Sequence, residues 1–334
     1  MSSPKFLEKD MQFTTKSARI FGADRPDVQI TAMAREANAE SNNFIPNIKP
    51  NYVFDRDRLT VVNAFLMSAW ADGAEEGLQL IGPTGSGKTS IIEQVCARLD
   101  APVMSITAHD RLEVPELISN IVAVKGSTLT VDGSLTMAMR EGYVFVLNEI
   151  DLVEPGTLTG LNDILERGFV VVPGTNELVR AAPGFAFVTT SNTGGGGDET
   201  GMYGGTRVQN LAFRDRFIKL MVDYPDKDTE MGILEGYFPG MDKRVAGGFI
   251  DVANMVRSAF MAGTGMDVTF STRTLIRWVR LTAQFGGMQD RGVSPVHYAL
   301  DLALANGTSE AISETLHTMV QQVIGVARHV PQAV

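Results

Sequence analysis

A glycine-rich loop with one lysine carries the strongest chemical signal in the sequence. Residues 82–89 read GPTGSGKT, in which two glycines, a lysine and a threonine follow the spacing G-x-x-x-x-G-K-[ST]. Glycine lets backbone N–H groups close around phosphate oxygens, the lysine adds a point charge, and the next hydroxyl is a ligand for Mg²⁺. We therefore predict a phosphate-binding loop formed by Gly82, Pro83, Thr84, Gly85, Ser86, Gly87, Lys88, Thr89 and Ser90.

Polar side chains follow two strongly apolar segments further along the chain. The run YVFVL at 143–147 leads into Asn148 and Glu149, and the run FAFVTT at 185–190 leads into Asn192. Ligands of parallel sheets bind outside the carboxyl ends of the strands, so we expect these side chains beside the phosphates. Glu149 is the candidate for polarising the attacking water, and the Asn192 amide is placed to hold the same water. The alternative is that Glu149 is a solvated acid at a strand end.

Alternating apolar runs and amphipathic stretches predict the elements that position these residues. Strands are expected at 78–82, 103–106, 143–147 and 185–190, and helices at 88–100, 114–119 and 157–167. Residues 121–135 predict a hairpin with its turn at Asp132-Gly133. Uniformly apolar strands between helices are typical of a parallel sheet covered on both faces, which predicts an α/β fold.

The chain divides by pattern into three parts. Residues 1–45 are polar and weakly periodic, and two prolines follow at 46 and 50, so we predict an N-terminal arm. Residues 46–225 hold the strands of the expected nucleotide-binding core. After MVDYP at 221–225 only helical periodicity remains, and we predict a small all-helical domain at 226–334.

The amino-acid composition limits which binding partners and which cellular compartment are expected. The 29 basic and 39 acidic residues leave a formal charge of −10, which argues against a nucleic-acid partner. The single cysteine, Cys96, can form neither an internal disulfide nor a cysteine-ligated metal site, and this fits a reducing compartment. The first residues lack the apolar stretch of a signal peptide, and no run of apolar residues is long enough for a bilayer. We expect a cytoplasmic protein without a membrane partner.

Five stretches give the chain a resemblance to a known family: NYVFDRD at 51–57, GPTGSGKTS at 82–90, EGYVFVLNEID at 141–151, TSNTGGGGDETGMYGGT at 190–206 and FRDRF at 213–217. They resemble the AAA+ ATPases and, within these, the MoxR branch, above all the ATPase subunit of cobaltochelatase. The resemblance implies a P-loop αβα sandwich with a parallel sheet, followed by a helical lid domain. It also implies ATP and Mg²⁺ as ligands and assembly into a homo-oligomeric ring, commonly a hexamer.

The same resemblance assigns roles to three further residues. Asn192 matches sensor 1, Arg216 matches the arginine finger that reaches the neighbouring subunit's nucleotide, and Arg273 in STRTLIRW lies where the lid's sensor 2 arginine is expected. On a helix, Arg214 and Arg216 point in different directions, so Arg214 is the reserve candidate for the finger. The alternative is a salt bridge of Arg216 within its own chain, to Asp215 or Asp223.

Asn148 departs from the family pattern, which has aspartate before the catalytic glutamate. The neutral amide can accept a hydrogen bond from a water on Mg²⁺, so Thr89 and Asn148 remain the candidates for the metal side of the site. Such a bond lacks the charge assistance that a carboxylate gives. We therefore expect slow hydrolysis.

Four functions compete. The first is an ATP-driven motor that remodels or activates a client protein, working with a partner that carries a von Willebrand factor A domain, as the family resemblance implies. The second is the chelatase subunit itself, although the sequence shows no tetrapyrrole site. The third is a nucleotide-dependent assembly scaffold with little hydrolysis, which Asn148 favours. The fourth, a nucleic-acid motor, conflicts with the acidic charge balance.

Overall fold

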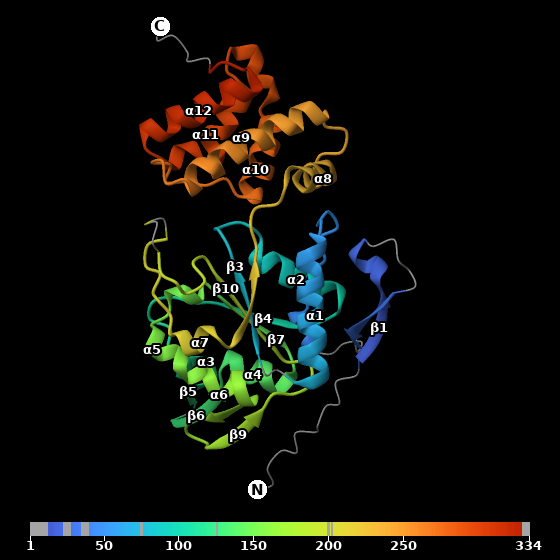
Figure 1. Ribbon diagram of the computed structural model, residues 1–334, viewed down its shortest axis with the longest axis vertical. Coiled ribbons are helices and arrows are strands. Elements are labelled where there is room, and N and C mark those ends of the chain that lie inside the picture. The colour runs from blue at the N-terminus through green and yellow to red at the C-terminus, as the bar shows by residue number, and fades with distance from the viewer. Residues whose placement is uncertain are drawn as a thin grey trace. The chain divides into compact units, whose positions relative to one another are not determined.

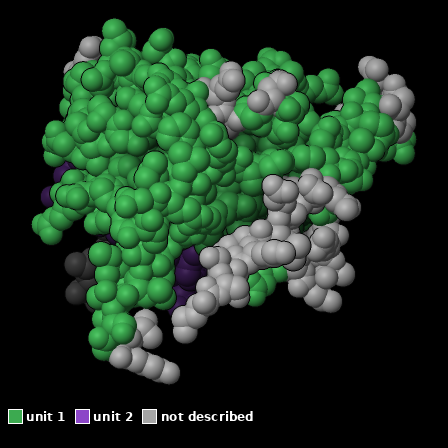
Figure 2. Space-filling model, turned by 90° about the horizontal axis from the view of Figure 1, so that it is seen from below, with its two compact units in different colours: residues 1–50, 56–82, 88–222 green, residues 51–55, 83–87, 223–334 purple. Residues whose placement is uncertain are grey.

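The computed structural model describes residues 13–22, 28–34, 40–73, 76–124, 126–198, 201 and 203–328. The chain divides into two compact units, coloured separately in Figure 2. The first comprises residues 1–50, 56–82 and 88–222, and the second comprises residues 51–55, 83–87 and 223–334. The phosphate loop therefore contributes to both, with its middle residues counted with the second unit.

The first unit is built on a five-stranded parallel sheet. The strand order is β11 (Phe217–Met221), β3 (Gly77–Ile81), β10 (Ala186–Ser191), β7 (Val144–Asn148) and β4 (Val103–Thr107). Every residue of β7 and β10 is buried, which explains why their sequences are continuously apolar rather than alternating. The predicted α/β class with a parallel sheet is confirmed.

Helices surround this sheet (Figure 1). They are α1 (Arg56–Asp72), α2 (Lys88–Arg98), α3 (Val114–Ile118), α4 (Ser134–Glu141), α5 (Pro155–Leu158), α6 (Asn162–Arg167) and α7 (Leu211–Arg214). On the sheet, the ring of Phe187 lies 5.5 Å from that of Phe145 and 6.3 Å from that of Phe217. These aromatic contacts join β7, β10 and β11 in one hydrophobic core, next to the strand ends that carry the polar residues.

The predicted turn at Asp132-Gly133 is wrong. Strands β5 (Ser119–Val124) and β6 (Ser127–Asp132) pair antiparallel with Ser119 opposite Asp132, so the turn lies at the other end of the hairpin. Gly133 instead caps α4, and its N–H donates to the Ile118 carbonyl at 2.8 Å. A Cβ on Gly133 would lie 2.3 Å from the Leu117 carbonyl oxygen. Close backbone approach, which the sequence pattern does not reveal, explains this glycine.

Two further antiparallel hairpins belong to the first unit. One is formed by β8 (Phe169–Val172) and β9 (Glu177–Arg180), and the other by β1 (Phe13–Ser17) and β2 (Gln29–Met33). The second hairpin falls within the predicted arm. Met33 is buried and its N–H donates to the Leu99 carbonyl at 2.9 Å, while Lys16 Nζ lies 2.5 Å from Asp100 Oδ2. These described residues pack against the end of α2.

The second unit is helical in its long C-terminal part. Its helices are α8 (Lys227–Tyr237), α9 (Lys243–Met261), α10 (Thr272–Gln284), α11 (Pro295–Ala303) and α12 (Glu310–Ile324). The fully buried Trp278 ring contacts Phe249 at 4.4 Å and Phe270 at 5.4 Å, and these rings centre the core. The predicted helical region after the sheet is confirmed. Within the described part of the chain, the helices include none with the length and apolarity to span a bilayer.

Candidate functional site

The glycine-rich loop joins the end of β3 at Ile81 to the start of α2 at Lys88. Gly85 and Gly87 adopt left-handed backbone conformations, with φ of +77° and +97°. Residues with a Cβ adopt this region at a cost, so the two glycines are required by the path of the chain. This strand, loop and helix arrangement matches the predicted phosphate loop from Gly82 to Ser90.

Lys88 and Asn192 are brought together although they lie 104 positions apart in the chain. Lys88 Nζ donates to Asn192 Oδ1 at 2.9 Å and to the Gly82 carbonyl at 2.6 Å. Burial lowers the pKa of the lysine to about 8, and the negative charges of Asp151 and Glu149 oppose that effect. The loop therefore holds a buried ammonium group whose positive charge is stabilised when an anion binds.

Asn148 lies at the carboxyl end of β7 with all its hydrogen-bonding groups engaged. Its Oδ1 accepts from Thr89 Oγ1 at 2.6 Å and from Thr190 Oγ1 at 3.2 Å. Its Nδ2 donates to Ser105 Oγ at 2.9 Å and to the Ile106 carbonyl at 3.4 Å. The amide thus links the strand ends of β4, β7 and β10 to the first turn of α2.

Glu149 is one of three residues other than glycine with positive φ in the described chain, with φ of 56° and ψ of 43°. Its N–H donates to Thr190 Oγ1 at 3.1 Å, and its side chain is exposed. A left-handed conformation at a glutamate costs about 1 kcal/mol or more and turns the chain sharply at the end of the strand. The carboxylate is therefore presented to solvent at the edge of the sheet where ligands bind.

Asp151 is a functional candidate that the sequence analysis did not include among the site residues. It is 1% exposed, and its Oδ2 accepts from the N–H groups of Asn192 and Thr193 at 2.8 and 2.9 Å and from Thr193 Oγ1 at 3.0 Å. Its Oδ1 is buried without a hydrogen-bond partner among the described residues. The sequence feature that could have revealed it is an acidic residue three positions after the end of a buried strand. Asp151 fixes the backbone that carries Asn192.

Arg216 lies at the opposite end of the sheet from the loop of its own chain. Its carbonyl accepts from the N–H of Gly77 at the start of β3, whereas the loop follows the end of that five-residue strand, about 16 Å further along. Its guanidinium forms an ion pair with Glu166 of its own chain, an acid that differs from the Asp215 or Asp223 of the alternative prediction. Arg216 is therefore too far from its own phosphate loop to act there.

The other two candidate arginines differ in exposure. Arg214 is half-buried at the end of α7, and its Nε has no hydrogen-bond partner in the described chain. Arg273 is exposed at the second position of α10, two residues after the capping residue Ser271. Arg273 belongs to the second unit and Arg214 to the first.

The donor atoms near Lys88 suit a hard divalent cation. Thr89 and Asn148 present oxygen atoms, which Mg²⁺ prefers, and Mg²⁺ usually keeps several waters of its own. Among the described residues, histidine, cysteine, aspartate and glutamate form no cluster of three or more that could hold a metal alone. The oxygen atoms of Thr89 and Asn148 therefore fit Mg²⁺ held together with a phosphate ligand.

Two known families match parts of the chain. The AAA domain (dynein-related subfamily) matches residues 77–217, and the CbbQ/NirQ/NorQ C-terminal family matches residues 230–323. The first match spans four of the five strands of the parallel sheet, the loop and Arg216, and the second spans most of the helical part of the second unit. The two matches therefore follow one another in the order of sheet and helices seen in the structure.

Individual relatives extend this similarity over most of the chain. The aerobic cobaltochelatase subunit CobS of Sinorhizobium sp is 28% identical over 284 residues, covering 82% of this chain and 82% of that protein. Protein NorQ of Paracoccus denitrificans is 29% identical over 221 residues, covering 64% of this chain and 76% of that protein. A solved structure of a RuvB mutant from Thermogota maritima covers 78% of this chain and 73% of its own at 13% identity, with a TM-score of 0.49.

Proposed function

Because the chain belongs to the MoxR-type AAA+ ATPases and is related to cobaltochelatase, we propose that it hydrolyses ATP in a ring of subunits that remodels or activates a client protein. One observation carries the proposal. The buried Lys88 ammonium meets the Asn192 amide at 2.9 Å beside a glycine loop, and Thr89 meets Asn148 at 2.6 Å. A phosphate chain bound there would pair with the positive charge of this buried lysine.

Each residue of the sheet edge has a proposed task. The loop N–H groups and Lys88 bind the β and γ phosphates, and Asn192 orients the attacking water. Glu149 accepts a proton from that water as it attacks, and its exposed position at the strand end leaves room for the water. Thr89 and Asn148 hold Mg²⁺, which neutralises phosphate charge when it is bound.

Arg216 acts on the nucleotide of the neighbouring subunit in this proposal. Its distance from the loop of its own chain supports a role across a subunit boundary, and its ion pair with Glu166 must open when the neighbour's phosphates arrive. Arg273 completes the proposed site as the sensor 2 arginine of the lid. The ring is proposed to be a hexamer in the cytoplasm, with a partner that carries a von Willebrand factor A domain.

Steady-state phosphate release by the purified protein tests this function. Glu149→Gln should keep ATP affinity within about threefold of wild type and lose hydrolysis by at least about a hundredfold. Arg216→Ala should also bind ATP and lose hydrolysis. Because the first variant has intact Arg216 and the second has intact Glu149, mixed rings should regain activity. Mixtures that co-assemble yet stay inactive would overturn the role across the boundary.

A nucleotide-dependent scaffold remains the second candidate, and Asn148 favours it. Its amide is fully engaged by four neighbouring groups and brings no negative charge to the metal side of the site. The same assay separates the two functions. Wild-type protein that binds ATP and forms rings, but releases phosphate no faster than Glu149→Gln, would establish the scaffold and overturn the motor.

A further inference from the structure

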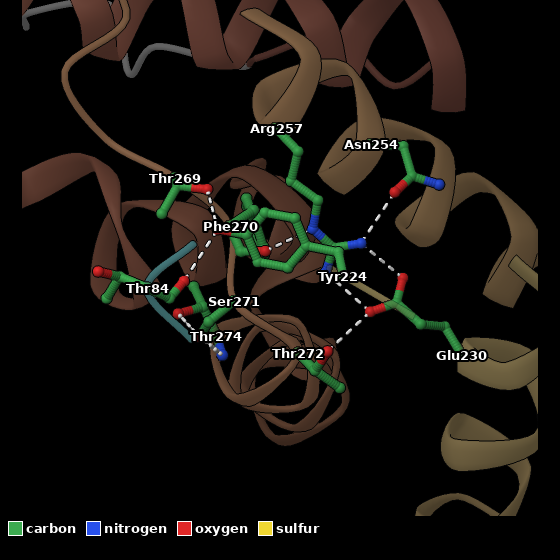
Figure 3. Close-up of polar contacts among 10 residues, drawn as sticks. All are labelled: Thr84, Tyr224, Glu230, Asn254, Arg257, Thr269, Phe270, Ser271, Thr272 and Thr274. Atoms are coloured by element: carbon green, nitrogen blue, oxygen red, sulfur yellow. Dashed lines mark hydrogen bonds and ion pairs between the residues drawn. The ribbon is translucent and has the colours of Figure 1, made fainter. Parts of the chain in front are cut away.

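Tyr224 links the phosphate loop to the segment that precedes α10, within the second unit (Figure 3). Its hydroxyl oxygen lies 2.9 Å from the Thr84 carbonyl oxygen and 2.7 Å from Thr269 Oγ1. A carbonyl can only accept a hydrogen bond, so the tyrosine donates to Thr84 and the Thr269 hydroxyl donates to the tyrosine. The three groups form a directed chain that requires a protonated tyrosine. Burial raises the pKa of Tyr224 and so keeps it protonated.

The ring of Tyr224 is held in place by a buried ion pair. The Arg257 guanidinium lies 4.5 Å from the ring centre, a distance at which a cation is attracted to an aromatic face. Two hydrogen bonds of 2.7 and 2.8 Å fix Arg257 to Glu230, and a third of 2.6 Å fixes it to the Phe270 carbonyl. The position of the tyrosine hydroxyl is therefore set by α8 and α9, not by the loop.

The next residue of the loop contacts the same segment. A Cβ on Gly85 would lie 2.3 Å from Ser271 Cβ, and Gly85 has a left-handed backbone. Ser271 accepts from the N–H of Thr274 at 3.0 Å and so caps α10. Two consecutive loop residues, Thr84 and Gly85, thus rest against Tyr224 and the start of α10.

Holding the Thr84 carbonyl determines where the next N–H points. A trans peptide is planar, and its C=O and N–H point in opposite directions. When the Thr84 oxygen faces Tyr224, the N–H of Gly85 faces away from it. We propose that Tyr224 is a positioning residue, whose hydroxyl orients the Thr84–Gly85 peptide so that the Gly85 N–H meets the phosphate oxygens of a nucleotide. This inference rests on the nucleotide binding proposed above.

Three single substitutions test the role. Tyr224→Phe removes only the hydroxyl, and Thr269→Val removes the group that donates to it. Tyr298→Phe is the matched control, because this half-buried tyrosine of α11 packs on Phe285 and its hydroxyl makes no hydrogen bond within the described chain. ADP affinity is measured by calorimetry, ATP turnover by phosphate release, and thermal unfolding without nucleotide by scanning calorimetry.

Loss of one oriented phosphate contact should weaken ADP binding by Tyr224→Phe about fivefold, with Thr269→Val intermediate and Tyr298→Phe unchanged. The KM for ATP should rise by the same factor at unchanged kcat, and the melting temperature without nucleotide should not fall. If wild-type protein binds ADP and Tyr224→Phe matches it within about twofold, nucleotide binding stands and the positioning role is wrong. A lower melting temperature with unchanged affinity also overturns it. Wild-type protein that binds no ADP overturns both proposals.

Discussion

Two buried clusters of charged groups in this chain are built in opposite ways. In the second unit, Glu230 accepts from both Nη atoms of Arg257 and from Thr272 Oγ1, and two further N–H groups of the guanidinium donate to Asn254 and to the Phe270 carbonyl. At the sheet edge of the first unit, Asp151 Oδ1 has no partner in the described chain, and burial lowers the pKa of Lys88. The carboxylate of the first cluster is paired at both oxygens, whereas the second cluster keeps one buried carboxylate oxygen without a partner in the described chain.

The difference separates two uses of a buried charge. A fully paired cluster contributes to the uniqueness of the fold, because removing either partner leaves an uncompensated charge. A cluster that disfavours its own charged form costs stability, and that cost is recovered when an anion binds. We therefore expect substitutions in the first cluster to act mainly on folding and those in the second mainly on binding.

Arg257→Ala should produce the largest effect on stability. Glu230 is 0% exposed, so loss of its partner should lower the free energy of unfolding by about 3 to 5 kcal/mol. Chemical denaturation followed by circular dichroism measures this change. Arg280→Ala, at an exposed arginine of α10, is the control and should change stability by less than about 0.5 kcal/mol. If Arg257→Leu with Glu230→Leu is no more stable than Arg257→Ala alone, the unpaired charge is not the cause.

Lys88→Ala should have the opposite result, a large loss of ATP binding with little change in stability. The affinity for ATP should fall by at least about a hundredfold, because the phosphates lose a charge-assisted hydrogen bond from a buried ammonium group. The free energy of unfolding without nucleotide should change by no more than about 1 kcal/mol, since the removed group was a cation in a site that disfavours cations. Calorimetric titration and denaturation of the same preparation give both values. Unchanged ATP affinity would remove the loop from the proposed site.

The pH dependence of ATP binding tests whether the buried Lys88 is protonated only at a cost. Without a bound nucleotide, Lys88 loses its proton as the pH rises through about 8, whereas a lysine beside phosphate keeps it. Binding above this pH takes up a proton, so affinity falls as the pH rises, by roughly tenfold between pH 7.5 and pH 9. Titrations at pH 9 in buffers of different ionisation enthalpy measure the uptake. Lys88→Arg is the control, because arginine stays protonated. Absence of proton uptake would contradict the lowered pKa.

Local patterns predicted four of the five strands of the sheet and placed polar residues at its ligand edge. The apolar runs at 143–147 and 185–190 became β7 and β10, and parallel pairing brought Asn192 to Lys88. The resemblance to MoxR-type AAA+ proteins is confirmed by the matches to two families and to CobS. The strand positions needed only periodicity and strand direction, whereas the family resemblance rested on the five sequence stretches that carry it.

Contacts between distant side chains could not be predicted in the same way. Arg257 and Glu230 lie 27 residues apart on different helices, and each taken alone has the pattern of an exposed charge. Tyr224 is a single tyrosine before a proline, and only folding brings its hydroxyl to Thr84. Gly133 was assigned to a turn because glycine after aspartate is typical of one, while its actual constraint is a carbonyl of α3. Tertiary packing decides all three cases.

Asn148 provides the test with the smallest expected effect. The groups around its Nδ2 favour an amide, whereas the groups around its Oδ1 suit an amide or a carboxylate equally well. Its Oδ1 accepts from the hydroxyls of Thr89 and Thr190, which would donate equally well to a carboxylate. Its Nδ2 faces Ser105 Oγ at 2.9 Å and the Ile106 carbonyl at 3.4 Å. The Ser105 hydroxyl can rotate so that it donates a hydrogen bond to a carboxylate. The Ile106 carbonyl can only accept a hydrogen bond, so it would repel a carboxylate.

Asn148→Asp should therefore produce a small gain. Negative charge toward the Mg²⁺ shell should lower the Mg²⁺ concentration for half-maximal phosphate release by up to about fivefold and raise turnover, an effect of about 1 kcal/mol at most. Repulsion from the Ile106 carbonyl and from Glu149 reduces that gain. Ser105→Ala combined with Asn148→Asp should cancel it, because the carboxylate then loses its donor from β4, whereas Ser105→Ala alone should leave the Mg²⁺ midpoint unchanged. If Asn148→Asp has the wild-type midpoint and no higher turnover, the neutral amide is no handicap, and the negative charge of the site comes from Asp151.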